Sequence, residues 1–350
     1  MSNCHPHKQT HYIIGIGRSG TTLLSKLLNQ HKNCLVTLET DFVIFFYHSF
    51  KDKTIFSKND FELIANYFNL FFKINPTVKP YFNNTNLLQD LSSTNFKSYQ
   101  ELIDFIYFRF NYIHKPSQDI SVIIDKKPSY SLHVDVLLKL NPESKFIYLV
   151  RDYRANILSR KQSIERRSPN TAFNAYRWLF FNKTIHTFKH RFPDKILEIK
   201  YEDLVTDTST TINKIISFLN LSTTDTDVMF YQEGELNSSQ IDTNNSLLNQ
   251  RIQKTREDLG KPIFKSRINA WKKELSQQDI ELSEAICSKY AESIGYSSTI
   301  NLNAFKKCIY IAKNFSKYLK ALYDYHKEFM LIHLKAETKL NRIKSKFKLS

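Results

Sequence analysis

Glycine is scarce in this chain, and the little there is clusters. Six of the 350 residues are Gly, and Gly15, Gly17 and Gly20 fall close together near the start. Long apolar runs are absent as well. We find no stretch of about 18 apolar residues, so we expect no transmembrane helix. The clustered glycines instead predict one place where the backbone must turn tightly or approach another group closely.

Cysteine is also sparse, and its spacing fits no metal site. Cys4, Cys34, Cys287 and Cys308 lie far apart, so we predict no metal. The N-terminal residues lack the basic region and the apolar stretch of a signal peptide. We therefore expect reduced thiols and a cytoplasmic location.

Acidic residues are few in the last part of the chain. The net charge is +16, and residues 301–350 hold 12 Lys or Arg against three Asp or Glu. Apolar residues recur there at helical spacing, which predicts an amphipathic helical tail. Two uses stay open: packing on its own domain or a partner, and peripheral contact with an acidic membrane. We expect no nucleic acid partner, and the sequence does not predict the oligomeric state.

Strand-like and helix-like segments alternate through most of the chain. The expected strands are 11–16, 34–38, 120–125, 145–150 and 195–201. The expected helices are 21–30, 129–140, 153–163, 170–190, 210–221, 265–273 and 276–293. This alternation predicts an α/β fold, with a P-loop-type parallel sheet flanked by helices.

Two stretches differ from this pattern. Residues 42–120 contain 20 Phe or Tyr and no Gly, and their patchy helical spacing predicts a helical insertion. We expect most of these aromatic side chains to lie in a core. Residues 222–262 are polar and long enough to form a lid. The resulting organisation is one domain over residues 1–300 with this insertion and lid, followed by the tail at 301–350.

The stretch "GIGRSGTTLL", residues 15–24, lies between an expected strand and an expected helix. A Gly-rich turn at a helix N-terminus is an anion site, because the first N–H groups have no partner inside the helix. Gly15, Gly20 and Thr22 keep the Walker A spacing, but Thr21 stands where that motif has Lys. Arg18 offers a different cation, which can bind two oxygens of one phosphoryl or sulfuryl group. The loop thus favours an anionic chain shorter than that of ATP or GTP.

A second anion position is predicted in "KFIYLVRDYRANILSRKQS", residues 145–163. Arg151 follows a buried-type strand, and Ser159 lies about two helical turns into the next helix. In parallel α/β sheets, ligands bind at the carboxyl ends of strands. An Arg and a Ser there suit a phosphate, although a surface Arg paired with Asp152 explains the residues equally well.

Together these segments resemble the sulfotransferases that use 3′-phosphoadenosine 5′-phosphosulfate (PAPS). "GIGRSGTTLL" is similar to their 5′-phosphosulfate loop, and "FIYLVRDYRANILS" is similar to their 3′-phosphate motif. "IIDKKPSYS" (123–131), "IKYEDLVTDTSTTINKIISFLNL" (199–221) and "GKPIFKSRINAWKKELSQQDIELSEAICSKYAESIGY" (260–296) extend the resemblance. They point to the tyrosylprotein and bacterial branch. The insertion and the tail match no family segment.

The resemblance implies PAPS as sulfuryl donor, no metal, and roles for individual residues. It implies Glu39 as general base, with Arg18 and Lys126 around the transferred group. It implies donor contacts from Gly17, Arg18, Ser19, Gly20, Thr21, Thr22, Arg151, Ser159, Tyr201 and Lys261. His48, His114 and His133 are alternative bases. Asp41 stands where the tyrosylprotein branch has Arg, which argues against an acidic peptide acceptor.

The acceptor and two other functions stay open. We expect a hydroxyl-bearing acceptor and favour a carbohydrate. A P-loop nucleotide kinase or NTPase is one alternative, with Asp125 and Asp152 as the residues that could hold Mg²⁺. A non-catalytic anion-binding protein that uses the basic tail is the other.

Overall fold

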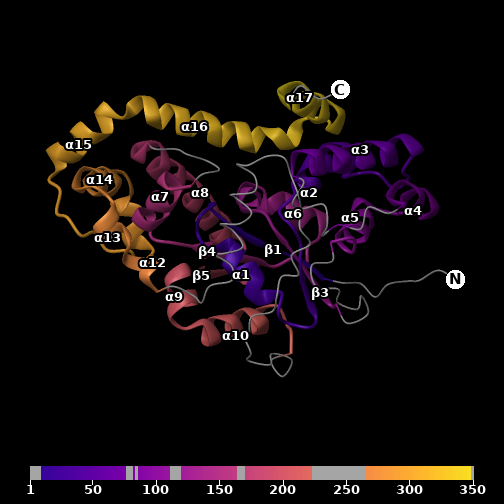
Figure 1. Cartoon of the computed structure of the whole chain (residues 1–350), viewed down its shortest axis with the longest axis horizontal. Coiled ribbons are helices and arrows are strands. Elements are labelled where there is room, and N and C mark those ends of the chain that lie inside the picture. Colours follow the sequence, from indigo (N-terminus) through magenta and orange to yellow (C-terminus); the bar gives the residue numbers. More distant parts are fainter. Residues whose placement is uncertain are drawn as a thin grey trace, which may run out of the picture.

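The computed structural model describes residues 9–75, 82, 86–110, 120–163, 170–222 and 265–347. Its centre is a five-stranded parallel sheet in the order β2-β3-β1-β4-β5 (Figure 1). The strands are β1 (Gln9–Gly15), β2 (Cys34–Val36), β3 (Val122–Lys126), β4 (Phe146–Val150) and β5 (Ile196–Lys200). The predicted α/β fold with a parallel sheet flanked by helices is confirmed.

Both faces of the sheet are buried, as the apolar strands require. In β1, Tyr12 and Ile14 belong to one core, whereas Ile13 belongs to the other. The smaller core is closed by α1 (Thr21–Leu28), α9 (Tyr201–Thr206) and α10 (Thr208–Phe218). The larger core is closed mainly by α6 (Val134–Leu140), α7 (Tyr153–Lys161) and α8 (Thr171–Arg191). The sheet thus holds its carboxyl edge fixed between two helical layers.

One expected helix is broken in the structure. Residues 129–140 were predicted as a single helix, but a 3₁₀ turn, η2 (Pro128–Leu132), precedes α6. Ser131 explains the break. Its Oγ accepts a hydrogen bond from the Gly15 N–H at 2.8 Å and donates to Gly15 O at 3.0 Å. This side chain ties the segment to the end of β1 and diverts it from a regular helix.

The aromatic-rich insertion is helical, as predicted. It contains α2 (Phe42–Phe50), α3 (Lys58–Ile74), α4 (Leu87–Ser93) and α5 (Tyr99–Tyr107). Its rings form a continuous part of the larger core, with Phe42, Phe46 and Phe68 completely buried. The aromatic residues described here therefore form core, as expected. The predicted lid at 222–262 lies outside the described residues, apart from Ser222.

The C-terminal part wraps around the domain. Three helices, α12 (Ser266–Asn269), α13 (Trp271–Glu274) and α14 (Gln277–Ser293), lie beside α7 and α8. The tail consists of α15 (Ala304–Lys313), α16 (Phe315–Met330), the short η5 (Leu331–His333) and α17 (Ala336–Phe347). Figure 1 shows α16 running along the top of the molecule above α8, with α17 beyond it near α2 and α3. None of the described helices is both long and apolar enough to span a bilayer.

Candidate functional site

The Gly-rich loop packs tightly between β4 and α9. A Cβ on Gly15 would lie 2.5 Å from Leu149 O, and one on Gly20 would lie 2.4 Å from the Tyr201 ring. Both glycines also have positive φ, at 145° and 97°. Arg18 has φ 75° without being glycine, a conformation that costs about 1–3 kcal/mol. Gly15 and Gly20 are thus explained by neighbouring protein groups, whereas Gly17 meets no close neighbour, and the strain at Arg18 is typical of a functional loop.

The start of α1 fits an anion. Gly20 is the N-cap and makes no side-chain cap hydrogen bond. The first N–H groups of the helix can therefore donate to an anionic ligand. Thr22 is exposed at this end, whereas Thr21 and Ser19 are buried. Two residues that the sequence interpretation missed support the loop from behind. Asn156 donates to Gly17 O at 3.1 Å, and Arg160 donates to the same oxygen at 3.5 Å.

Arg151 lies beside the loop, directly after β4. Its Nη1 donates to Arg18 O at 3.3 Å, and its Nη2 donates to Arg267 O at 3.0 Å. Its Nε is buried without a hydrogen-bond partner among the described residues. Burial lowers the pKa of this guanidinium, because removal from water disfavours its charged form. A buried cation with an unused donor fits the predicted second anion position.

The two predicted anion positions meet in the structure. Arg18 Nε donates to Ser159 Oγ at 3.1 Å, although 141 residues separate them. The alternative pairing of Arg151 with Asp152 does not occur, because Asp152 pairs with Arg154 at 2.7 Å. Tyr201 stacks on Arg151, with the guanidinium carbon 4.1 Å from the ring centroid. This ring thus supports Arg151, a contact that the sequence interpretation did not foresee.

The predicted base and its predicted cation are in direct contact. Glu39 follows β2 and Lys126 ends β3, and these strands are neighbours in the sheet. Lys126 Nζ lies 2.9 Å from Glu39 Oε2. The Glu39 side chain is 40% exposed and can be reached by an acceptor. Arg18 was expected beside this pair, but its guanidinium is directed toward Ser159 instead.

A second ion pair extends this cluster, and the sequence interpretation missed it. Lys127 Nζ lies 2.8 Å from Asp41 Oδ1 and 3.9 Å from Glu39 Oε1. Burial opposes the charged form of Lys127, but Asp41 and then Glu39 outweigh it and raise the pKa of this ammonium. The pairs form because β2 and β3 are neighbours in the sheet, which the sequence alone did not show.

The two carboxylates considered for Mg²⁺ are already engaged. Asp125 is completely buried, and its oxygens accept from Thr37 at 3.1 Å and from Tyr107 at 2.5 Å. Burial raises the pKa of Asp125 to about 7. Asp152 caps α7 and pairs with Arg154. The described residues contain no cluster of three or more His, Cys, Asp or Glu that could hold a metal ion.

His133, one of the three alternative bases, is enclosed by protein. His133 is buried and stacks on Phe329, with ring centroids 5.8 Å apart. Burial lowers its pKa to about 4. His114 lies outside the described residues, as does Lys261, which was expected to contact the donor. His48 is exposed on α2.

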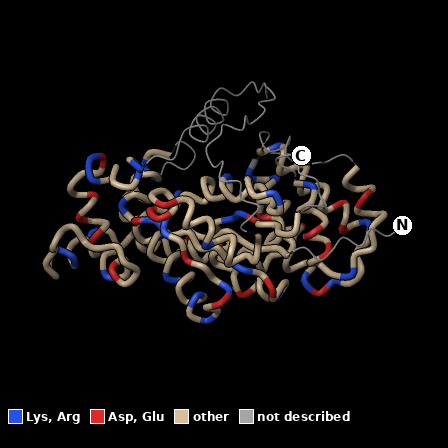
Figure 2. Tube along the Cα trace, turned by 90° about the horizontal axis from the view of Figure 1, so that it is seen from below, with Lys and Arg blue, Asp and Glu red and all other residues tan. Residues whose placement is uncertain are grey.

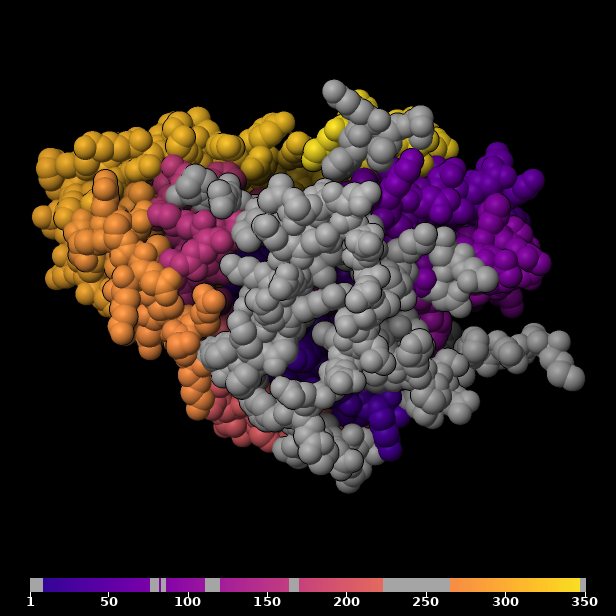
Figure 3. Space-filling view, in the orientation of Figure 1, coloured from indigo at the N-terminus to yellow at the C-terminus, as the bar shows by residue number. Residues whose placement is uncertain are grey.

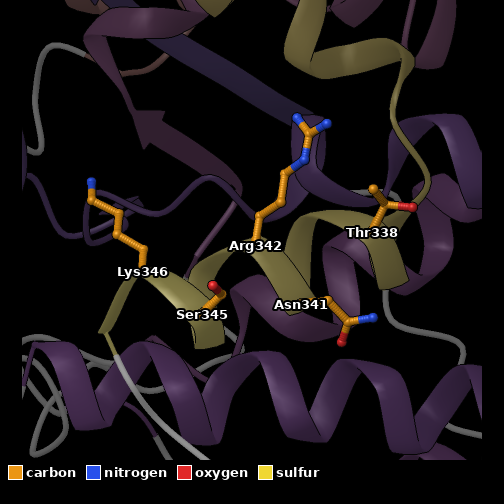
Figure 4. A pocket seen from close by; sticks show the side chains of 5 residues that line it. All are labelled: Thr338, Asn341, Arg342, Ser345 and Lys346. Carbon is orange, nitrogen blue, oxygen red and sulfur yellow. The ribbon is translucent and has the colours of Figure 1, made fainter.

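A pocket of about 520 Å³ opens along α17, and its described lining is polar and basic. Figure 4 shows Arg342 and Lys346 extending to the same side of this helix. One turn before Arg342, Lys339 Nζ donates to the carbonyl oxygens of Ile44 and Phe45 in α2. Burial lowers the pKa of Lys339 to about 8, and the nearby Asp41 carboxylate opposes that shift. The pocket therefore lies on a helix anchored next to the Glu39 cluster.

Comparisons with known proteins identify a family and a fold. Residues 12–225 match the model of the sulfotransferase family. The sulfotransferase domain of the Synechococcus PCC 7002 olefin synthase aligns with 87% of this chain and 99% of its own, at 18% identity and a TM-score of 0.50. The sulfotransferase domain from the curacin biosynthetic pathway covers 81% and 98%, at 19% identity and a TM-score of 0.47. No curated protein matches the chain.

Proposed function

The chain belongs to the sulfotransferase family, and we propose that it transfers the sulfuryl group of PAPS to a hydroxyl of its acceptor. The observation that carries the proposal is the contact between Arg18 and Ser159. It joins a Gly-rich loop on an uncapped helix to a second strand–helix junction that holds a buried Arg. Two adjacent anion positions suit a donor with a 5′-phosphosulfate and a separate 3′-phosphate.

The donor would be held mainly by backbone N–H groups and by the two cations Arg18 and Arg151. We assign the 5′-phosphate to the N–H groups at the start of α1, with Thr21 and Thr22. Arg151, through its unused Nε, and Ser159 would bind the 3′-phosphate. Gly17, Ser19 and Gly20 shape the loop. Tyr201 positions Arg151, and Lys261 stays a predicted donor contact.

The chemistry would take place at Glu39. Its carboxylate removes the proton of the acceptor hydroxyl as the acceptor oxygen bonds to sulfur and the bond between sulfur and the bridging oxygen breaks. Lys126 lies 2.9 Å from Glu39 and can stabilise charge on the transferring group. Arg18 is exposed and can turn from Ser159 toward the bridging oxygen. The proposed reaction needs no metal.

We propose a carbohydrate as acceptor. The pocket on α17 presents hydroxyl, amide and cationic groups, which suit the hydroxyls and any acidic substituent of a sugar. Asp41 beside Glu39 would repel an acidic peptide. We also propose a cytoplasmic location, because Cys287 and Cys308 are not in disulfides.

Ligand-dependent melting tests the donor assignment. We expect adenosine 3′,5′-bisphosphate to raise the melting temperature of the wild type and to have little effect on Arg151→Ala. ATP with Mg²⁺ should stabilise less. Stabilisation by ATP with Mg²⁺ alone would support a P-loop kinase or NTPase instead. Incubation with ³⁵S-labelled PAPS and panels of sugars, peptides and phenols then identifies the acceptor, and label on peptides alone would exclude a carbohydrate.

A further inference from the structure

One side of the tail packs on its own domain. Ala321 of α16 is completely buried against α8. Tyr325 OH lies 2.9 Å from Thr184 Oγ1, and Glu328 pairs with Arg177 at 2.8 Å. The tail is thus held in a fixed orientation, and its opposite side faces away from the domain. Figure 3 shows α15 and α16 along the upper left edge of the molecule.

The outward side of the tail is apolar rather than polar. Phe315, Leu319 and Tyr323 follow one another at spacings of four, so they share one helix face. Met330 at the end of α16 lies on the same face by helical spacing, and Phe305 is exposed on α15, beyond the break at Asn314. The exposed fractions are 76% for Phe305, 55% for Phe315, 48% for Leu319, 65% for Tyr323 and 56% for Met330. Five large exposed apolar side chains on two consecutive helices are unusual for a surface that meets only water.

Lysines border this apolar row. Lys313, Lys320 and Lys327 are seven residues apart, so they form a line along one edge of the helices. All three are exposed. Lys320 marks the boundary with the domain, since its Nζ lies 5.5 Å from the ring centroid of Phe173.

The described helices α15 and α16 hold two acidic residues, Asp324 and Glu328, and both are half-buried. Glu328 pairs with Arg177 of the domain, whereas Asp324 lies one helical turn from Lys320 and Lys327. Elsewhere the two signs of charge are interspersed, as Figure 2 shows along the described trace. The outward face therefore combines an apolar row with exposed lysines along its edge.

We propose that the outward face of α15 and α16 binds the surface of a membrane that contains anionic lipids. Apolar side chains of such a face enter the boundary between headgroups and acyl chains, and lysines along its edge attract anionic headgroups. A second copy of the chain fits less well. Two such faces brought together would oppose three exposed lysines on each copy, with one half-buried acidic residue, Asp324, on each to pair with them.

Vesicle co-sedimentation tests the proposal directly. The full-length protein should sediment with vesicles of phosphatidylcholine mixed with phosphatidylserine and stay in solution with phosphatidylcholine alone. Replacing Lys313, Lys320 and Lys327 together with Gln should weaken binding about a hundredfold, since each lysine near an anionic surface contributes roughly fivefold. A control with Gln at the exposed Lys58, Lys214 and Lys289, with the same change in net charge, should retain binding within a few-fold.

The apolar contribution is tested separately. Phe315→Ser with Leu319→Ser should reduce vesicle binding at least tenfold, whereas Ile55→Ser, at a residue 84% exposed elsewhere, should not. The melting temperatures of all variants should match the wild type, since every altered side chain is exposed. Equal binding to both kinds of vesicle, or binding to neither, would overturn the proposal. So would a stable dimer in solution that Phe315→Ser with Leu319→Ser converts to monomer.

Discussion

The two halves of the site are built differently. On the proposed donor side, Gly15, Gly20 and Arg151 are fixed by close packing and burial. On the proposed acceptor side, Glu39, Asp41 and the two lysines are held by side-chain ion pairs, with both carboxylates at least 40% exposed. The backbone of the proposed donor side therefore leaves little room for other residues. On the proposed acceptor side, single substitutions can change the ion pairs without disturbing the backbone. Donor binding and the chemical step should accordingly respond to different variants.

The largest effect should come from Glu39→Gln. Loss of the base should lower kcat by about 10²- to 10⁴-fold, because that is the usual contribution of a positioned general base. The affinity for adenosine 3′,5′-bisphosphate should stay the same, since Glu39 lies on the acceptor side. Steady-state kinetics and calorimetric titration give the two values. An equal loss in kcat and in affinity for the bisphosphate would show that the proposed donor and acceptor sides are not independent.

Arg151→Ala should produce the reverse pattern. It removes charged hydrogen bonds to the proposed 3′-phosphate, each worth about 1.5–3 kcal/mol, so the Kd for the bisphosphate should rise roughly a hundredfold. Ser159→Ala should have a smaller effect in the same direction. Titration with adenosine 5′-phosphate supplies the control, because a ligand without the 3′-phosphate should distinguish wild type from variant poorly. Equal losses for both ligands would place Arg151 elsewhere on the donor.

Gly20→Ala tests the rigidity of the donor side. The new Cβ would meet the Tyr201 ring at 2.4 Å in a backbone conformation with φ 97°. We expect a loss of about 1–3 kcal/mol in the free energy of unfolding, measured in urea. Gly17→Ala is the matched control. Its Cβ would meet only Arg160 Nη1 at 3.8 Å, so little loss is expected. Similar losses of unfolding free energy in both variants would contradict a steric constraint that acts at Gly20 and not at Gly17.

Asp41→Asn should have the smallest effect and tests the acceptor side. Without Asp41, Lys127 can pair fully with Glu39, and a nearby positive charge stabilises the ionised carboxylate. The tighter ion pair leaves the Glu39 carboxylate less able to accept the proton of the acceptor hydroxyl, so kcat should fall about three- to tenfold in steady-state kinetics. An unchanged kcat would mean that Lys127 does not act on Glu39.

The Gly-rich loop and the place of Arg151 were largely predictable from the sequence. The backbone demands Gly where φ is positive, and Arg151 directly follows a buried-type strand. The parallel sheet was predictable as well, because buried strands and amphipathic helices leave periodic patterns in the sequence.

Contacts between distant side chains were not predictable. The pairing of Asp41 with Lys127 joins residues 86 positions apart, and nothing in either local sequence selects the partner. The break at η2 depends on Ser131, whose hydroxyl meets Gly15 only after the chain has folded. In the tail, apolar residues surround more than one side of the helix, so spacing alone did not separate the docked side, with Tyr325, from the outward side, with Tyr323.

The anchoring of α17 on α2 has a consequence for synthesis of the protein. Lys339 binds Phe45 O across 294 residues, and Ala336 N–H donates to Ser49 Oγ across 287. Ribosomes add roughly 5–20 residues per second, so α2 emerges roughly 15–60 s before its cover. Until α17 has been synthesised, no residue of that helix covers α2 at Phe45. The proposed acceptor side can therefore be covered only after residues 336–347 have been synthesised, long after the Gly-rich loop.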